Sequence, residues 1–147
     1  MPNHPPPPVG RSPLNAALLS SWSSGDPCDD AWYGITCEGR SVVRLQLTNV
    51  GLRGTLPSEV GALSSLSVME LRFTSLSGTL PSSLGRLTAL VQLGLGYNSF
   101  SGGLPSELFL LTRLSGSLEL FNNPISGTLP CQVRGRAAWA GGSPCLA

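Results

Sequence analysis

Few residues in this chain have side chains that could carry covalent or metal chemistry. There are four cysteines and a single histidine, His4, which lies in a proline-rich stretch near the N-terminus. The cysteines fall in two pairs, Cys28 with Cys37 and Cys131 with Cys145. Neither spacing is the C-x2-C of a zinc site, so they are either two disulfides in an oxidising compartment or buried free thiols. We therefore expect neither a metal ion nor a cofactor.

The charged residues exclude several further classes of protein. Nine basic and eight acidic residues give a net charge of +1, and every basic residue is arginine. This balance argues against a surface for nucleic acid or anionic lipid. The absence of lysine excludes a Schiff base or a phosphate-loop lysine, and the serines have no histidine beyond His4 to activate them. No apolar run approaches the roughly 18 residues that a membrane span needs.

A repeat organises the rest of the chain. The tetrad Gly-x-Leu-Pro occurs four times, with glycines 24, 24 and 25 residues apart, at Gly54, Gly78, Gly102 and Gly127. Each unit opens with an L-x-L alternation, which is the period of a strand with one buried face. A single unit cannot bury its apolar columns alone, but stacked neighbours make these columns continuous. We place the extra residue of the last spacing at Leu114.

The apolar columns continue in register from one unit to the next. The first two columns hold Leu45, Met69, Leu93 and Leu118, and then Leu47, Leu71, Leu95 and Leu120. Within the tetrad, glycine tolerates unusual backbone angles and the following proline ends the strand. Tandem recurrence in register makes an isolated phosphate loop or a helix an improbable explanation of these stretches.

The aligned units resemble the plant-type leucine-rich repeat, LxxLxLxxNxLxGxLPxxLGxLxx. Upstream, AALLSSWSSGDPCDDAWYGITC resembles the N-terminal cysteine cap of the same family. The resemblance implies an α/β repeat fold: a right-handed leucine-rich-repeat solenoid with a short parallel β-sheet on the concave face and mostly loop and 3-10 helix on the convex side. It also implies that Cys28 and Cys37 form the cap disulfide, with Trp22 and Trp32 covering the first coil.

Four segments follow from these patterns. Residues 1–11 form a proline-rich disordered leader, 12–41 the N-terminal cap, 42–133 about four 24-residue repeats, and 134–147 a C-terminal cap or irregular tail. Cys131 and Cys145 could close the last coil together with Trp139. We leave this second pairing open.

The repeats depart from the family pattern at one column. The family places asparagine at the ninth position, where its amide satisfies backbone groups around the bend. Here that column reads Val50, Thr74, Asn98 and Asn123. We therefore expect the first two coils to be less well fixed than the last two.

Outward positions of the strands form columns across the concave face, because alternate residues of a strand share one side. The columns are Arg44, Val68, Gln92 and Ser117, then Gln46, Glu70, Gly94 and Glu119, then Thr48, Arg72, Gly96 and Phe121, with Asn49, Phe73, Tyr97 and Asn122 just beyond. Arginine and exposed aromatic residues are favoured at recognition surfaces. Our binding candidates are Arg44, Gln46, Thr48, Glu70, Arg72, Phe73, Gln92, Tyr97, Glu119 and Phe121.

One pair of carboxylates invites an enzymatic interpretation. Glu70 and Glu119 share a column with Gly94 between them, so their backbones lie roughly 10 Å apart. Glycosidase carboxylates can be about 6.5–9.5 Å apart, so distance alone does not exclude catalysis. Gly94 provides no pocket wall, however, and an open sheet excludes little water. We interpret both as solvated surface carboxylates paired with Arg72 or Arg44, and expect no enzyme.

The resulting hypothesis is a recognition module that presents a concave surface to a protein, peptide or oligosaccharide, as the resemblance to receptor-like kinase ectodomains implies. A free-standing inhibitor of a cell-wall-degrading enzyme, similar to the polygalacturonase inhibitors, is one alternative. A structural fragment without a specific ligand is another, because Gly94 and Gly96 supply no side chains. The resemblance implies an extracellular or cell-surface location; the N-terminal stretch has no apolar signal region, which leaves the cytoplasm open, and the oligomeric state is undetermined.

Overall fold

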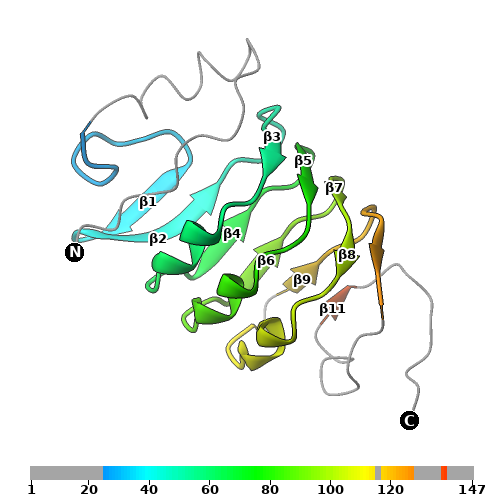
Figure 1. Cartoon of the computed structure of the whole chain (residues 1–147). Coiled ribbons are helices and arrows are strands. Elements are labelled where there is room, and N and C mark those ends of the chain that lie inside the picture. The colour runs from blue at the N-terminus through cyan, green and yellow to red at the C-terminus, as the bar shows by residue number, and fades with distance from the viewer. Residues whose placement is uncertain (1–24, 115–116, 128–136, 139–147) are drawn as a thin grey trace.

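The largest of three sheets runs through all the described coils and is mostly parallel. The computed structural model describes residues 25–114, 117–127 and 137–138. Its main sheet has the order β1 (Ile35–Glu38), β2 (Ser41–Gln46), β4 (Val68–Glu70), β6 (Gln92–Gly94), β9 (Ser117–Glu119) and β11 (Ala137–Ala138). Only the β1–β2 pair is antiparallel among these. Figure 1 shows the strands side by side, and after β2, β4 and β6 the chain returns through a 3-10 helix that lies nearer the viewer than the sheet.

The strand register confirms the repeat frame. Leu45 pairs with Met69, Met69 with Leu93 and Leu93 with Leu118. All four side chains are buried, because the L-x-L alternation turns them to the inside of every coil. Residues 24 positions apart in the sequence are therefore neighbours on adjacent strands.

The convex side carries three short 3-10 helices. They are η2 (Ser58–Ala62), η3 (Ser82–Arg86) and η4 (Ser106–Leu110), and each begins directly after the proline of a Gly-x-Leu-Pro tetrad. Proline suits this position because its fixed φ is compatible with a helix start and its missing N–H is not needed there. The helices stack closely: a Cβ on Gly85 would lie 2.5 Å from Glu107 Cβ, so this position requires glycine.

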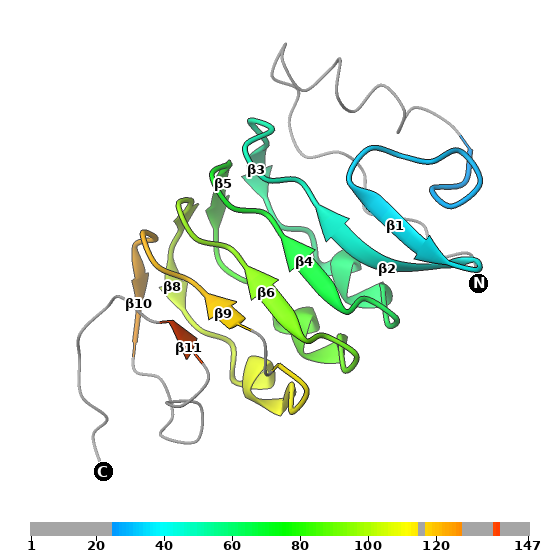
Figure 2. The ribbon, with the colours of Figure 1, turned by 180° about the vertical axis from the view of Figure 1, so that it is seen from behind.

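A second set of short strands forms a side wall that the sequence interpretation did not include. The strands are β3 (Arg53–Thr55), β5 (Ser75–Gly78) and β7 (Ser99–Phe100) in one parallel sheet, and β8 (Gly102–Gly103) with β10 (Ile125–Ser126) in another. Figure 2 shows them beside the main sheet, where the chain bends into the convex side. Each of the first three coils therefore has three sides: main sheet, side wall and 3-10 helix.

Leucine fills the space between these three sides. The buried hydrophobic residues form one continuous cluster from Val42 in the first coil to Leu120 in the last. Leu114 belongs to this cluster at the position equivalent to Leu66 and Leu90, and its N–H bonds to Leu111 O as theirs bond to Leu63 O and Leu87 O. The extra residue of the fourth unit therefore follows Leu114, and our assignment of the insertion to Leu114 itself was wrong.

Two asparagines connect neighbouring coils from the inside. Asn98 Nδ2 donates to Leu71 O of the preceding coil at 2.7 Å and to Leu95 O of its own at 3.1 Å. Asn123 Nδ2 repeats the pattern, with Leu95 O at 2.9 Å and Leu120 O at 3.1 Å.

The two earlier positions of the asparagine column lack this connection. Thr74 reaches only Leu71 O and Asn98 Oδ1, and Val50 is buried without a polar group. A backbone bond from Asn49 N–H to Arg72 O still joins the first coil to the second. The lower stability expected for these two coils stays a prediction.

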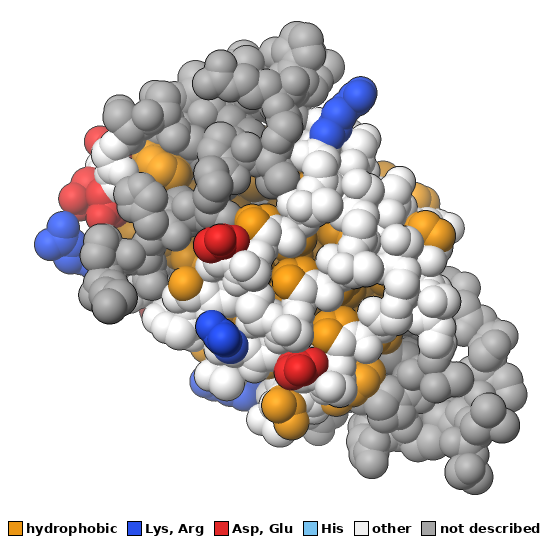
Figure 3. All heavy atoms as spheres, viewed as in Figure 1, with side chains coloured by type: hydrophobic (Ala, Val, Ile, Leu, Met, Phe, Trp, Pro, Cys, Tyr) orange, Lys and Arg blue, Asp and Glu red, His pale blue; other side chains and the backbone are white. Residues whose placement is uncertain are grey.

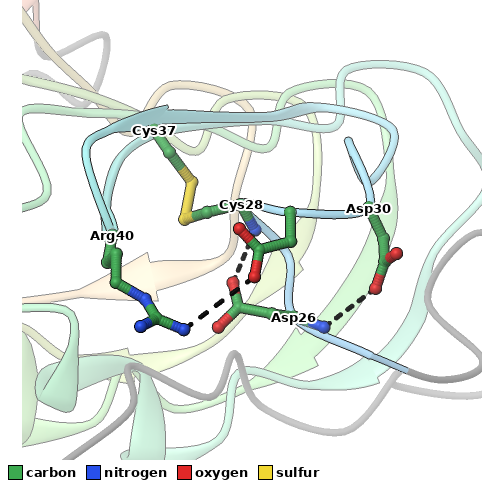
Figure 4. The surroundings of a disulfide bond; sticks show 6 residues. Asp26, Cys28, Asp30, Cys37 and Arg40 are labelled. Atoms are coloured by element: carbon green, nitrogen blue, oxygen red, sulfur yellow. Dashed lines mark hydrogen bonds and ion pairs between the residues drawn. A yellow bond between two sulfur atoms is a disulfide. The ribbon is translucent and has the colours of Figure 1, made fainter.

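The N-terminal cap is closed by the predicted disulfide, Cys28–Cys37, with a Cα–Cα distance of 5.6 Å. Figure 4 shows it next to a loop in which Asp26 accepts a hydrogen bond from the Cys28 N–H at 2.8 Å. Trp32 is buried beside the first coil. Residues 1–24, Trp139 and the pair Cys131 and Cys145 lie outside the described residues, so the predicted leader, the role of Trp22 and the second disulfide stay predictions.

Candidate binding surface on the concave sheet

The concave face carries the first two predicted columns in register. Arg44 pairs with Val68 and Val68 with Gln92, while Gln46 pairs with Glu70 and Glu70 with Gly94. On the first coil the outward residues are all exposed: Arg44, Gln46, Thr48 and Asn49. Their side chains form no hydrogen bond or ion pair with any residue of the described part of the chain. We call this row of exposed polar side chains the coil-1 row.

The middle of the face is organised by one arginine. Arg72 Nη1 donates to Glu119 Oε2 at 2.8 Å, and Arg72 Nε lies 2.7 Å from Glu70 Oε2. The second contact lacks hydrogen-bond geometry, so it is an attraction of charge rather than a directed bond. Gln92 Nε2 donates to the other Glu70 oxygen at 2.5 Å. These four side chains, which we call the Arg72 clamp, link β4, β6 and β9.

Glycine at position 94 makes the clamp possible. A Cβ on Gly94 would lie 2.3 Å from Glu70 Oε2, so the carboxylate fills the space that a side chain would take. Glu70 is consequently 4% exposed, which corrects our expectation of a solvated carboxylate. The predicted pairing with Arg72 is present, whereas Arg44 pairs with neither glutamate among the described residues.

The Arg72 clamp argues against Glu70 and Glu119 as a catalytic carboxylate pair. Both carboxylates contact one guanidinium, and Glu70 is also held by Gln92. A general acid and a nucleophile need access to a substrate between them, and here that space contains Arg72. Glu70, Arg72, Gln92 and Glu119 therefore form a structural network, of which Arg72 and Glu119 stay partly exposed. It carries two negative charges and one positive charge.

Three aromatic rings stack along the ends of the strands. Phe73 and Tyr97 lie face to face with centroids 4.2 Å apart and planes inclined by 14°. Tyr97 meets Phe121 edge to face at 5.2 Å. Phe121 also lies over Gly96, where an added Cβ would be 3.0 Å from the ring. The side chain of Glu70 thus covers Gly94 and the ring of Phe121 covers Gly96, so these two glycines do not leave the face empty.

The sequence interpretation missed a shallow groove on the convex side. Residues of η2, η3 and η4 line it, among them Glu59, Arg86, Glu107 and Leu110. Figure 3 shows isolated side chains of both charges on this side of the molecule. No local signal marks the groove, because its residues come from three coils and meet only through stacking. Among the described residues, no three metal-ligating side chains come close enough together to hold an ion.

Comparison with known proteins agrees with this architecture. Residues 10–38 match the family model described as leucine rich repeat N-terminal domain. A probable leucine-rich repeat receptor-like protein kinase of Arabidopsis thaliana is 47% identical over 55 residues, which are 37% of this chain and 6% of that protein. The ectodomain of BIR2 from Arabidopsis thaliana has a TM-score of 0.74 at 30% identity, over 83% of this chain and 66% of that one.

The chain is a plant-type leucine-rich-repeat protein. A further solved relative of this repeat protein is the Arabidopsis receptor kinase HAESA in complex with the peptide hormone IDA and the co-receptor SERK1. That similarity has a TM-score of 0.55 at 33% identity and covers 63% of this chain but 15% of the other. The leucine-rich-repeat chain thus spans a small part of the receptor kinases that it matches. No helix within its described residues is long and apolar enough to cross a membrane.

Proposed function

We propose that this leucine-rich-repeat protein is an extracellular or cell-surface recognition module whose concave face binds a protein or peptide partner without catalysis. The observation that carries the proposal is the concave face itself. A row of unpaired polar side chains lies beside a partly exposed arginine and a stack of aromatic rings on a rigid sheet. Arginine and aromatic side chains are the residues that most often dominate binding energy.

The side chains of the concave face support a role in binding rather than in catalysis. The two glutamates are bound to Arg72, and two of the solved structures that the chain resembles are a receptor ectodomain and a receptor kinase complex. One of those relatives binds a peptide hormone. The Cys28–Cys37 disulfide supports a location in an oxidising compartment. A standard interface of about 800 Å² per partner would occupy most of this short face.

A matched pair of double variants tests the proposal. Arg44→Ala with Tyr97→Asn removes one exposed arginine and one exposed ring from the concave face. Arg86→Ala with Leu110→Asn removes one exposed arginine and one exposed apolar side chain from the convex groove. Asparagine suits position 97 because the same column already holds it at Asn49 and Asn122.

The binding measurement uses a panel of secreted plant peptides, receptor ectodomains and pectin-degrading enzymes on the immobilised chain. We expect at least one peptide or ectodomain to bind, and its Kd to rise about tenfold or more in the concave variant only. Binding that the concave variant retains in full contradicts the proposal, as does a panel without any partner. Inhibition of a pectin-degrading enzyme would instead support the inhibitor alternative.

A further inference from the structure

The backbone at the ends of the concave strands is left-handed in every described coil. Asn49, Phe73, Tyr97 and Asn122 have φ of 58°, 54°, 57° and 54°. Asparagine enters this region readily, but a bulky ring there is a genuine outlier. Burial does not compensate for the strain, because Phe73 is 49% and Tyr97 44% exposed. Strained residues that stay exposed are candidates for contact with a ligand.

The aromatic stack ends with an uncovered ring face at Phe73. Tyr97 covers the face of Phe73 that points to the third coil. The equivalent position of the first coil holds Asn49, which is too small to continue the stack, and Phe73 has no other ring partner among the described residues. Neighbouring parallel strands lie about 4.8 Å apart, close to the thickness of one stacked ring. One further ring therefore fits on Phe73, above Asn49.

The surroundings of that place are polar. The coil-1 row offers one guanidinium, two amides and one hydroxyl group, all exposed. It extends for about 13 Å, the four residue steps from Arg44 to Thr48, and this is close to the length of three sugar rings. The row contains no carboxylate, so it does not favour a basic peptide. Its amides can donate and accept at once, as the hydroxyl groups of a sugar require.

We propose that the coil-1 row and the free face of Phe73 form a subsite for a short oligosaccharide. One sugar ring packs its C–H face on Phe73, and the following rings lie along the coil-1 row, where Gln46 and Asn49 bond to hydroxyl groups. A carboxylate on the last ring would meet Arg44. An aromatic side chain of a peptide would cover Phe73 equally well, and its backbone could also bond to the amides, so a peptide is one of the outcomes that the test distinguishes. This subsite lies on the same concave face that we propose for the protein partner, but it is tested with separate ligands.

Nuclear magnetic resonance of the full chain with labelled phenylalanine rings tests the subsite. The probes are cellotriose, which is neutral, trigalacturonate, which is acidic, and the peptide Gly-Tyr-Gly. We expect saturable shifts of the Phe73 signals with at least one trisaccharide at concentrations up to about 10 mM, and no such shift with the peptide. A preference for trigalacturonate that Arg44→Ala abolishes would assign the carboxylate contact to Arg44.

Three variants separate the subsite from nonspecific binding. Phe73→Asn should weaken the trisaccharide about tenfold or more, and it introduces the residue that the column carries in coils 1 and 4. Gln46→Ala should weaken it several-fold without touching the aromatic stack. Leu110→Asn, on the convex side, should change nothing. Three results would overturn the inference: no shift with either trisaccharide, equal binding of the peptide, or unchanged trisaccharide binding in both Phe73→Asn and Gln46→Ala. None of these results decides the separate test of the protein partner.

Discussion

Changing Asn98 to aspartate removes two hydrogen-bond donors from the inside of the solenoid without changing the size of the side chain. Asn98 Nδ2 is 2.7 Å from Leu71 O and 3.1 Å from Leu95 O. Its Oδ1 accepts bonds from Leu76 N–H at 3.1 Å and from Thr74 Oγ1. Aspartate keeps the acceptor, but places a second oxygen against the two carbonyl oxygens. The variant therefore removes the donor half of the connection between coils and adds a negative charge at the same place.

The expected loss follows from these contacts. A hydrogen bond contributes about 1 kcal/mol net, and a buried group left without a partner costs about 1–3 kcal/mol. Leu71 O keeps the bond from Thr74 Oγ1 and Leu95 O keeps the bond from Asn123 Nδ2, so two bonds are lost but neither carbonyl is left without a donor. Because the new carboxylate oxygen also lies against both carbonyl oxygens, Asn98→Asp should lower the free energy of unfolding by about 2–5 kcal/mol. That is a large part of the roughly 5–15 kcal/mol available to a typical domain.

Asn122 offers a matched control in the following coil. It is exposed, and aspartate also accepts the left-handed backbone that it adopts. Asn122→Asp should change the free energy of unfolding by no more than about 0.5 kcal/mol. Urea unfolding followed by circular dichroism measures both variants under the same conditions. If Asn98→Asp costs less than about 1 kcal/mol, or no more than the control, the asparagine connection does not hold the coils together as we argue.

Three further predictions concern the same coils and the cap. Thr74→Asn should raise the free energy of unfolding by about 1 kcal/mol, measured by urea unfolding. An amide at position 74 can reach Leu47 O and Leu52 N–H, just as Asn98 reaches Leu71 O and Leu76 N–H one coil later. An unchanged urea midpoint would show that the first coil lacks the geometry for these bonds. Replacing Cys28 and Cys37 together by serine should lower the free energy of unfolding by about 2–3 kcal/mol, since the bond closes a short loop. Reductant should lower the Tm of the parent more than that of the variant, and equal shifts would contradict a stabilising role of this bond. Gly94→Ala should lower the free energy of unfolding by about 1–3 kcal/mol, because the added Cβ displaces the Glu70 carboxylate. In a background that carries Glu70→Ala, the same substitution should cost less. Fully additive effects of the two substitutions would contradict the contact.

The concave columns could be predicted because they depend on local pattern only. The L-x-L alternation fixes which face of each strand is buried, and the 24-residue spacing fixes which residues become neighbours. The positions of Phe73 and Tyr97 in one column followed from the same count. The cap disulfide was identified through resemblance to a family rather than from spacing.

The state of each side chain on that face could not be predicted in the same way. Glu70 is buried only because residue 94, 24 positions later, is glycine and leaves room for its carboxylate. The stack of Phe73 on Tyr97 ends at the first coil only because residue 49 is asparagine. The burial of Glu70 and the end of the aromatic stack both depend on contacts between residues of different coils. The pattern of residues within one coil does not predict such contacts.

The sequence by itself determined the repeat, the buried columns, the position of each turn and the residue types that reach the concave face. Periodicity is sufficient for this because every coil repeats the same local geometry. The tertiary structure decided that Glu70 is bound to Arg72 rather than solvated, that the side wall forms two further short sheets, and that the face of Phe73 toward the first coil stays open. These features arise where coils touch, because the free volume at each contact is set by the size of the side chain on the neighbouring coil.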